Sequence, residues 1–330
     1  MRRVARIFAA RIPDLLMKPL SLLSTVFVGA LLASCTPEQK APDSSKSSEM
    51  TPPASTHGRI VVYVANYPLA YFAERIGGPE VEVKFPAPPD VDPAFWEPSE
   101  SEVEAFQSAD IILLNGASYS HWLDTVTLPD SKTVNTSASF SDKFIVVKDA
   151  VTHSHGGEGE HSHSGTVFTT WIDFDQAIQQ ADAVREALQT FRPGQVELFA
   201  LNFDQLKADL LALDMAMKSE GKRLAGQPLV VSHPIYQYWA RRYGLNVQSV
   251  LWEPDTVPDE SQIEAFKKIL ATHPAKWMVW EGAPAAAAVE KLRDLGVNGV
   301  VFDPSANVPE KGTWLDVMKA NVQEIKKITP

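Results

Sequence analysis

The second half of the chain alternates short apolar runs with longer amphipathic segments, and this alternation limits the available folds more than any other feature. Strands are predicted at 228–232, 246–251, 277–280 and 299–302, and helices at 235–243, 260–272, 284–295 and 312–327. Strands that alternate with helices form βαβ units, in which the strands run parallel. The segment 222–330 is therefore expected to form an α/β lobe around a parallel sheet.

Three of these predicted strands are followed by side chains of the types that bind metals. His233 follows the run that ends at Ser232, Glu281 follows Trp280, and Asp303 follows Phe302. In an open α/β sheet, ligands bind in the crevice outside the carboxyl ends of the strands. Polar residues after a strand can also simply cap the following helix. However, metal-binding residue types occur at this position in three βα units, which favours a ligand site.

The segment 59–192 has a similar but less regular pattern. Strands are predicted at 60–64, 81–84, 111–114 and 144–147, and helices at 69–76, 99–107 and 171–188. Ser99 and Glu102 have the spacing of a capping box, which marks a helix start. We expect an N-terminal α/β lobe here.

The strongest helical pattern lies between these two lobes, in the segment 193–221. Apolar residues repeat at alternating steps of three and four, which predicts one apolar stripe along a long helix: Val196, Phe199, Phe203, Leu206, Leu210, Leu213 and Met217. A long core helix of one domain would show the same stripe. Its position between two α/β segments favours a helix that bridges them, with the ligand site in the cleft between the lobes.

A histidine-rich tract occupies residues 152–164, within the first lobe. It holds four of the eight histidines of the chain, which are His153, His155, His161 and His163. The tract contains no apolar residue after Thr152, so it is expected to be a mobile loop and not part of the core. Neutral imidazoles bind Zn²⁺, Cu²⁺ and Ni²⁺, so the tract is predicted to contact metal.

The N-terminal segment 1–34 is expected to be a signal peptide. Basic residues precede an apolar stretch of the length of a signal sequence, which ends at Leu32-Ala33-Ser34-Cys35. Cys35 is the only cysteine, so it cannot form an intramolecular disulfide, and we expect it to be lipidated. An ordinary cleavage site with an incidental cysteine is the alternative. Residues 35–58, rich in serine and proline, are predicted to be a disordered tether.

The charge of the chain excludes one broad class of partner. The net charge is −11, and it is −15 once the segment 1–34, with five basic and one acidic residue, is set aside. Nucleic-acid binding needs a basic surface, so we expect none. We also find no P-loop, HExxH, GxSxG or GxGxxG motif in a suitable context, and predict no catalytic residues and no enzyme.

Six segments between Arg59 and the C-terminus are distinctive when taken together: NYPLAYFAERIGG, DPAFWEPSESEVEAFQSADIILLNG, TTWIDFDQA, LVVSHPIYQYWARRYGL, WMVWEGAP and VVFDPSANVPEKGTWLDVMKANVQEI. Through these segments the chain resembles the metal-specific substrate-binding lipoproteins of bacterial zinc/manganese ABC importers. The resemblance implies two α/β lobes joined by one rigid long helix, with a metal between them.

The resemblance also implies part of a ligand set. His233 and Asp303 match ligands of the family, and Glu281 matches a nearby acidic residue that is not always a ligand. Ala94 and Thr169 stand where the family has its two first-lobe histidines. Zinc takes about four ligands, so we expect substitutes for the missing pair. The predicted set is His121, His163, His233 and Asp303, with Glu281, His153, His155 and His161 as additional candidates.

The resulting prediction is an exported, lipid-anchored protein on the periplasmic side of a membrane. It would capture a divalent metal ion, and we expect Zn²⁺ in preference to Mn²⁺. The protein would act as a monomer and deliver the ion to the permease and ATPase of an ABC importer. The alternative is a degenerate member of the family without a metal in the cleft, which would bind another small ligand or a protein. A zinc hydrolase is a distant third, because no motif places a general base.

Overall fold

The computed structural model describes residues 58–147, 152–154, 160–162 and 165–329. The described residues all belong to one compact unit, Ala54–Pro330. The predicted signal segment, Cys35 and the tether up to residue 57 lie outside the described residues. Within the described ranges, no helix combines the length and the apolar character needed to cross a membrane.

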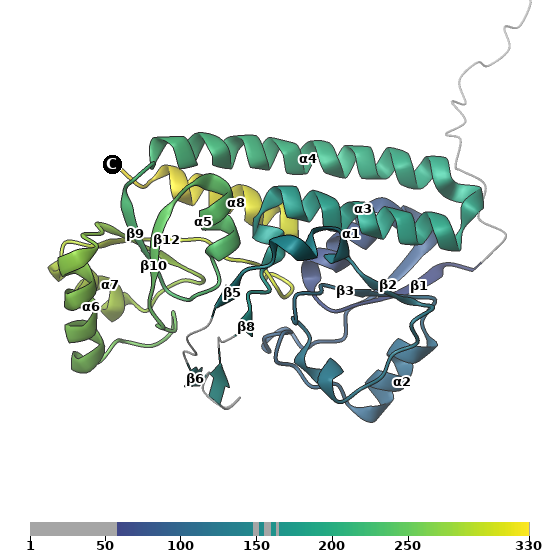
Figure 1. Cartoon of the computed structure of the whole chain (residues 1–330), viewed down its shortest axis with the longest axis horizontal. Helices are drawn as coiled ribbons and strands as arrows, with labels where there is room; N and C mark the ends of the chain where they lie inside the picture. The colour runs from purple at the N-terminus through teal and green to yellow at the C-terminus, as the bar shows by residue number, and fades with distance from the viewer. Residues whose placement is uncertain (1–57, 148–151, 155–159, 163–164, 330) are drawn as a thin grey trace, which may run out of the picture. The chain divides into compact units, whose positions relative to one another are not determined.

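A four-stranded parallel sheet forms the first lobe (Figure 1). Its strand order is β2-β1-β3-β4, and the strands are β1 (Ile60–Val64), β2 (Val81–Lys84), β3 (Ile111–Leu114) and β4 (Thr133–Asn135). Ile60, Val62 and Val64 are buried on alternate positions of the central strand β1. The apolar strand pattern thus packs one face of β1 into the core.

The helices of the first lobe begin where their sequences supply a cap. They are α1 (Tyr67–Gly77), α2 (Glu100–Ser108) and α3 (Phe174–Phe191). The Asn66 side chain accepts from the Leu69 amide at the start of α1, and Ser99 and Glu102 form the predicted capping box of α2. These caps satisfy backbone donors that a helix leaves unpaired. Short 3₁₀ turns complete the lobe: η1 (Gly78–Glu80), η2 (His121–Asp124), η3 (Ala138–Lys143), η4 (Thr170–Ile172) and η5 (Pro193–Gln195).

The second lobe repeats the topology of the first. Its parallel sheet has the order β10-β9-β11-β12, with β9 (Pro228–Val231), β10 (Asn246–Ser249), β11 (Trp277–Trp280) and β12 (Asn298–Val301). In both sheets, the first strand in sequence lies between the second and the third. The helices are α5 (Gln237–Tyr243), α6 (Glu260–Thr272), α7 (Ala286–Asp294) and α8 (Trp314–Lys326).

Helix α4 (Val196–Arg223) runs along both lobes (Figure 1). Its 28 residues span about 42 Å at the usual rise per residue. It packs against α1 and α3 of the first lobe and against α5 and α8 of the second. The predicted stripe from Phe199 to Met217 is buried, whereas Val196 at the start of the helix is 41% exposed. The prediction of two lobes joined by one long helix is therefore confirmed.

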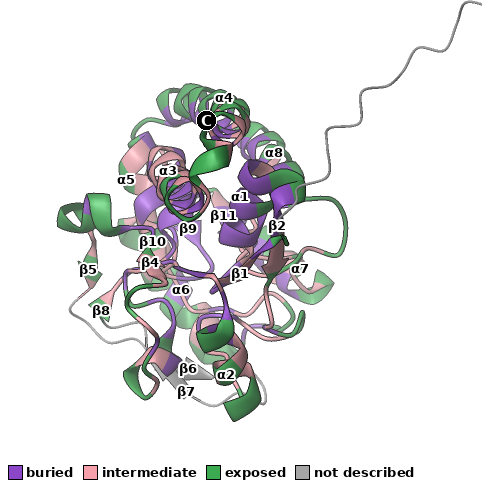
Figure 2. Ribbon diagram, turned by 90° about the vertical axis from the view of Figure 1, so that its right-hand side faces the viewer, coloured by how far each residue is buried: buried purple, intermediate pink, exposed green. Residues whose placement is uncertain are grey.

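The described lobes share one hydrophobic core. The largest cluster of buried residues includes side chains from β1, α1, α3, α4, β9, α5 and α8. Figure 2 shows the outer side of α4 exposed, with buried segments gathered where β1, β9 and β11 lie. Hydrogen bonds also cross between the lobes: Trp171 Nε1 donates to the Pro304 carbonyl at 2.8 Å, and Tyr238 Oη donates to the Val167 carbonyl at 2.9 Å.

Two predictions for the first lobe need correction. The segment 144–147 is not the fourth strand of the sheet, because the three-residue strand β4 takes that place. Instead β5 (Val146–Val147) pairs antiparallel with β8 (Gly165–Thr166). The histidine-rich tract is also not wholly loop: β6 (Thr152–Ser154) and β7 (Glu160–Ser162) pair antiparallel. The backbone pairs of these strands satisfy donors and acceptors without needing apolar side chains.

Candidate metal centre

Each strand of the second sheet is followed by one side chain of a type that binds metals. Glu253 comes after β10, His233 after β9, Glu281 after β11 and Asp303 after β12. The sheet changes direction of winding at β9, whose neighbours are β10 and β11. Ligands bind at such switch points, outside the carboxyl ends of the strands. The fold therefore brings the imidazole and the glutamates together at the expected binding position.

His233 lies between the two glutamates. Its Nε2 is 3.1 Å from Glu253 Oε1, and its Nδ1 is 2.9 Å from Glu281 Oε1. The ligand-type atoms of these three residues lie within 4.8 Å of one another. The His233 side chain is only 2% exposed, whereas the two glutamates are 22% and 23% exposed. One imidazole and two carboxylates thus converge in a partly solvated pocket.

The protonation of His233 follows from this arrangement. Burial lowers the pKa of His233, but hydrogen bonds and charge interactions with Glu253 and Glu281 outweigh burial and raise it to about 9. At neutral pH, the free protein therefore holds an imidazolium between two carboxylates. Because imidazolium has no lone pair to donate, a metal has to displace this proton.

Asp303 is fixed beside the cluster by its own backbone contacts. The Asn321 side chain accepts from the Asp303 amide at 3.0 Å and donates to the Asp303 carbonyl at 2.7 Å. The Ser305 amide donates to the Asp303 carboxylate at 2.6 Å. Burial raises the pKa of Asp303, the Ser305 amide lowers it, and the charge of Glu281 raises it. The carboxylate is positioned for a cation that would neutralise it.

The cluster opens into a cavity of about 260 Å³ between the lobes. His233, Glu253, Glu281 and Asp303 line it from the second lobe, while Asp92, Tyr119 and Thr169 are among the residues that line it from the first. The donor set is one nitrogen and several carboxylate oxygens. Zinc accepts both donor types, and Mn²⁺ favours the oxygens.

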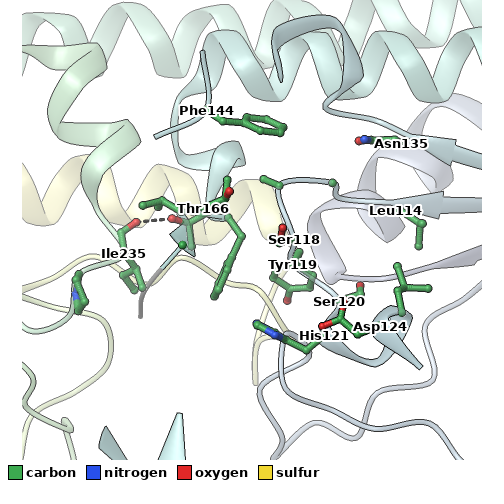
Figure 3. A pocket seen from close by; sticks show the side chains of 18 residues that line it. Leu114, Ser118, Tyr119, Ser120, His121, Asp124, Asn135, Phe144, Thr166 and Ile235 are labelled. Atoms are coloured by element: carbon green, nitrogen blue, oxygen red, sulfur yellow. Dashed lines mark hydrogen bonds between the residues drawn. The ribbon is translucent and has the colours of Figure 1, made fainter. Parts of the chain in front are cut away.

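A larger cavity of about 670 Å³ adjoins the first, and it holds His121 (Figure 3). The His121 ring is exposed and stacks on Phe95, with ring centroids 5.1 Å apart. In the close-up, Thr166 and Ile235 lie across the cavity from Leu114 and Asp124. The structure thus brings His233, Glu281 and Asp303 to one cavity and places His121 in the other.

The two positions that carry histidines in the resembling family offer no metal ligand here. Ala94 is fully buried, and its methyl group cannot bind a metal. The Thr169 hydroxyl is buried and donates to the Ile235 carbonyl of the second lobe. Among the tract histidines, His155 and His163 lie outside the described residues. His153 and His161 are opposite one another in the backbone pairing of β6 and β7.

At the equivalent position of the first sheet, buried side chains fill the space where a ligand would bind. Asn66 follows β1, and Asn115 follows β3, as His233 and Glu281 follow β9 and β11. Asn66 Nδ2 donates to Asn115 Oδ1 at 3.2 Å, and both residues are fully buried. The Gln180 amide also donates to Asn115 Oδ1, at 3.1 Å. Neutral amides fill this position, so the charged donors are concentrated in the second lobe.

Sequence reasoning overlooked Glu253. The strand 246–251 was expected, and the same rule that singled out Glu281 and Asp303 applies to the polar residue after it. Trp252 separates the strand from Glu253, and its side chain is buried against Phe266, with ring centroids 4.9 Å apart. A search for the first metal-type side chain within four residues of each strand end would have found Glu253.

Two α/β lobes, a long connecting helix and a cleft between the lobes define the class of two-lobed substrate-binding proteins with one rigid connecting helix. The chain belongs to the family of the zinc-uptake complex component A periplasmic protein, ZnuA, whose model matches residues 62–328.

Individual relatives are distant. The zinc-binding protein AdcA of Streptococcus pyogenes is 23% identical over 292 residues, which cover 82% of this chain and 56% of AdcA. The manganese-binding lipoprotein MntA of Bacillus subtilis is 23% identical over 198 residues, which cover 59% of this chain and 62% of MntA. The chain thus spans less than two thirds of these two curated relatives. The crystal structure of the metal-dependent lipoprotein YcdH from B. subtilis superposes with a TM-score of 0.69 at 18% identity, covering 82% of this chain and 98% of YcdH.

Proposed function

We propose that this chain captures a divalent metal ion in the cleft between its lobes and delivers it to an ABC importer, and that the ion is Zn²⁺ in preference to Mn²⁺. The observation that carries the proposal is the cluster of His233, Glu253 and Glu281 at the switch point of the second sheet. Membership of a zinc-uptake family supports zinc as the cargo. AdcA and MntA are named for zinc and manganese binding, which supports these two ions as the ones to compare.

The proposed ligands are His233, Glu253, Glu281 and Asp303. They supply the four donors that zinc commonly takes, all from one lobe. The first lobe covers the ion and contributes Asp92 to the wall of the cavity. We further propose that His121 and the tract histidines His153, His155, His161 and His163 act outside this set, the tract by raising the local metal concentration.

The remaining parts of the proposal concern placement and partners. We propose that residues 1–34 are removed as a signal peptide and that Cys35 carries a lipid, so that the protein is held on the extracytoplasmic side of a membrane. The permease and the ATPase of an importer would be its partners. The proposed domain boundaries are a first lobe at 59–192, a bridging helix at 193–221 and a second lobe at 222–330.

A second candidate function has an observation in its favour. Both nitrogens of His233 already contact carboxylates, so the cluster is a complete ion-pair network without a metal. A family member that had lost its cargo would keep such a network for stability alone. This candidate predicts that the cleft binds no zinc.

Titration of the untagged mature chain with zinc, monitored by calorimetry and by thermal melting, distinguishes the two candidate functions. Zinc should raise the melting temperature, because a ligand that binds only the folded state stabilises it. His233→Ala should abolish the shift. His273→Ala is the matched control, because His273 lies in the same lobe and its Nε2 contacts the Leu229 carbonyl at 2.9 Å, outside the cavity. Equal shifts in the parent and both variants would contradict the cleft assignment.

A further inference from the structure

The larger cavity is not explained by the binding of a single ion. Its volume of about 670 Å³ falls in the range of roughly 300–1,000 Å³ that small-molecule sites occupy. It shares Tyr119, Phe168, Thr169 and Ile235 with the smaller cavity that holds the donor cluster. The two cavities therefore adjoin, and one ligand can extend from the cluster into the larger space.

A buried hydroxyl marks the boundary between the cavities. Tyr119 is 1% exposed, and among the described residues its Oη has no hydrogen-bond partner. A buried hydroxyl without a partner costs free energy unless a ligand or a water satisfies it. Because Tyr119 lines both cavities, a molecule that occupies this boundary would supply the missing partner.

The wall beside Tyr119 is aromatic. The Phe168 ring is edge-on to Tyr119, with centroids 5.3 Å apart, and to Phe95 at 6.2 Å. His121 stacks on Phe95. Phe95, Phe168 and His121 are each partly or fully exposed. The phenyl rings of Phe95 and Phe168 contact flat organic groups well, and they offer no donor atom to a metal ion.

The backbone at this wall is held in an uncommon conformation. Gly116, Ala117 and Ser118 have φ values of 75°, 51° and 59° in succession, and all three line the larger cavity. Only glycine adopts such values at low cost, and strained residues concentrate at ligand sites. A Cβ at position 116 would meet Asn135 Oδ1 at 2.1 Å, so glycine is required there.

We propose that the cleft takes its metal as a complex with a small organic chelator, the metal lying at the donor cluster and the chelator extending past Tyr119 into the larger cavity. The inference rests on the proposed function, because it needs the metal at the cluster. The chelator supplies donors from the side of the first lobe, which lacks its two histidines, and zinc then keeps about four ligands by using only part of the second-lobe set. Four carboxylates line the smaller cavity, Asp92, Glu253, Glu281 and Asp303, so the complex should carry net positive charge. A zinc complex with one amino acid such as histidine meets this requirement, whereas a zinc–citrate complex is negative.

Equilibrium dialysis of the mature chain with labelled zinc and labelled L-histidine tests the inference. We expect the chain to retain about one histidine when zinc is present and none when zinc is absent, and to retain no labelled citrate in either case. Retention of zinc without histidine would overturn the inference and leave the proposed function standing. Retention of citrate in place of histidine would overturn the charge argument and with it the inference. If neither zinc nor histidine is retained, both proposals are wrong.

Two variants assign the retained histidine to the larger cavity. Thr166→Trp fills part of that cavity and should lower histidine retention by at least about tenfold through overpacking, while zinc alone binds as in the parent. Tyr119→Phe keeps the ring and removes the hydroxyl, so it should weaken histidine retention by roughly three- to tenfold, the effect of one lost hydrogen bond. Circular dichroism checks that both variants fold. Unchanged histidine retention in both variants would place the histidine elsewhere and overturn the inference.

Discussion

Zinc and a proton are predicted to compete for His233, and this competition should set the pH dependence of binding. In the free protein the pKa of His233 is about 9, since the bonds to Glu253 and Glu281 outweigh the effect of burial. At pH 7, about 1% of the imidazole is therefore neutral, which weakens the apparent zinc affinity by about 100-fold, or about 2.7 kcal/mol. Affinity should rise about tenfold per pH unit from pH 7 and level off near pH 9.

The assay is a competition titration against a zinc chelator of known proton affinity, at half-unit steps from pH 6.5 to 9.5. Calorimetry in two buffers with different ionisation enthalpies should show release of about one proton per zinc bound at pH 7.5. An imidazole with an ordinary pKa near 6.5 would release almost none there. An affinity that is flat between pH 7.5 and 9 would refute the assignment of His233 as a protonated ligand.

Two variants separate the proton competition from the loss of a ligand. Glu253→Gln removes one of the carboxylates that raise the pKa of His233, so the levelling-off point should move to lower pH. Asp303→Asn makes the same chemical change in the same cavity, but the groups that raise the pKa of His233 are Glu253 and Glu281, whereas Asp303 bonds Ser305 and Asn321. It should lower the affinity at every pH and leave the levelling-off point in place. A shift in both variants, or in neither, would contradict the mechanism.

Three further predictions follow from the same features. The folded-state pKa of His233 exceeds its unfolded value near 6.5, so its contribution to metal-free stability is complete below pH 6.5 and is lost as pH rises through 9. Urea unfolding at pH 6 and pH 10 should show the parent losing about 3 kcal/mol more than His233→Ala, and equal losses would contradict the pKa assignment. Cys35→Ala should block lipidation, and intact-mass analysis of the membrane fraction should find an uncleaved precursor; a mature N-terminus at another residue would rule out the lipid anchor. Deletion of 153–163 should lower the number of zinc ions bound per chain while the zinc-induced melting shift of the cleft persists; unchanged stoichiometry would show that the tract binds no zinc.

The regular parts of the fold could be predicted because local patterns determine them. The apolar runs of the second lobe became β9, β11 and β12, and the capping box at Ser99 starts α2 as expected. The fourth strand of the first sheet could not be predicted in this way. Strand β4 has only three residues, Thr133 to Asn135, and no apolar run. Its pairing with β3 is fixed by tertiary contacts, whereas the sequence pattern favours the more apolar segment at 144–147, which pairs with β8 instead.

The candidate site could be predicted only where its residues directly follow a predicted strand, because ligands bind outside the carboxyl ends of parallel strands. This reasoning placed His233, Glu281 and Asp303 at one edge of the second sheet, and in the structure these three residues line one cavity. It could not place His121, because the turn after β3 passes through Gly116, Ala117 and Ser118, three residues with positive φ. Such a turn redirects the chain, and two of these residues give no sequence signal for it. The ring of His121 consequently lies against Phe95, in the other cavity.

The distribution of donors bears on how a metal would leave the cleft. On the proposed function, all four ligands extend from the second lobe, and the lobes are tied together by contacts such as Trp171 to Pro304 and Tyr238 to Val167. Separation of the lobes would break these buried hydrogen bonds and expose part of a shared core, yet it would remove no ligand from the metal. Protonation of His233 removes one ligand directly, and Glu253 and Glu281 already stabilise the protonated state. Metal release is therefore expected to depend more on proton uptake at this cluster than on opening of the lobes.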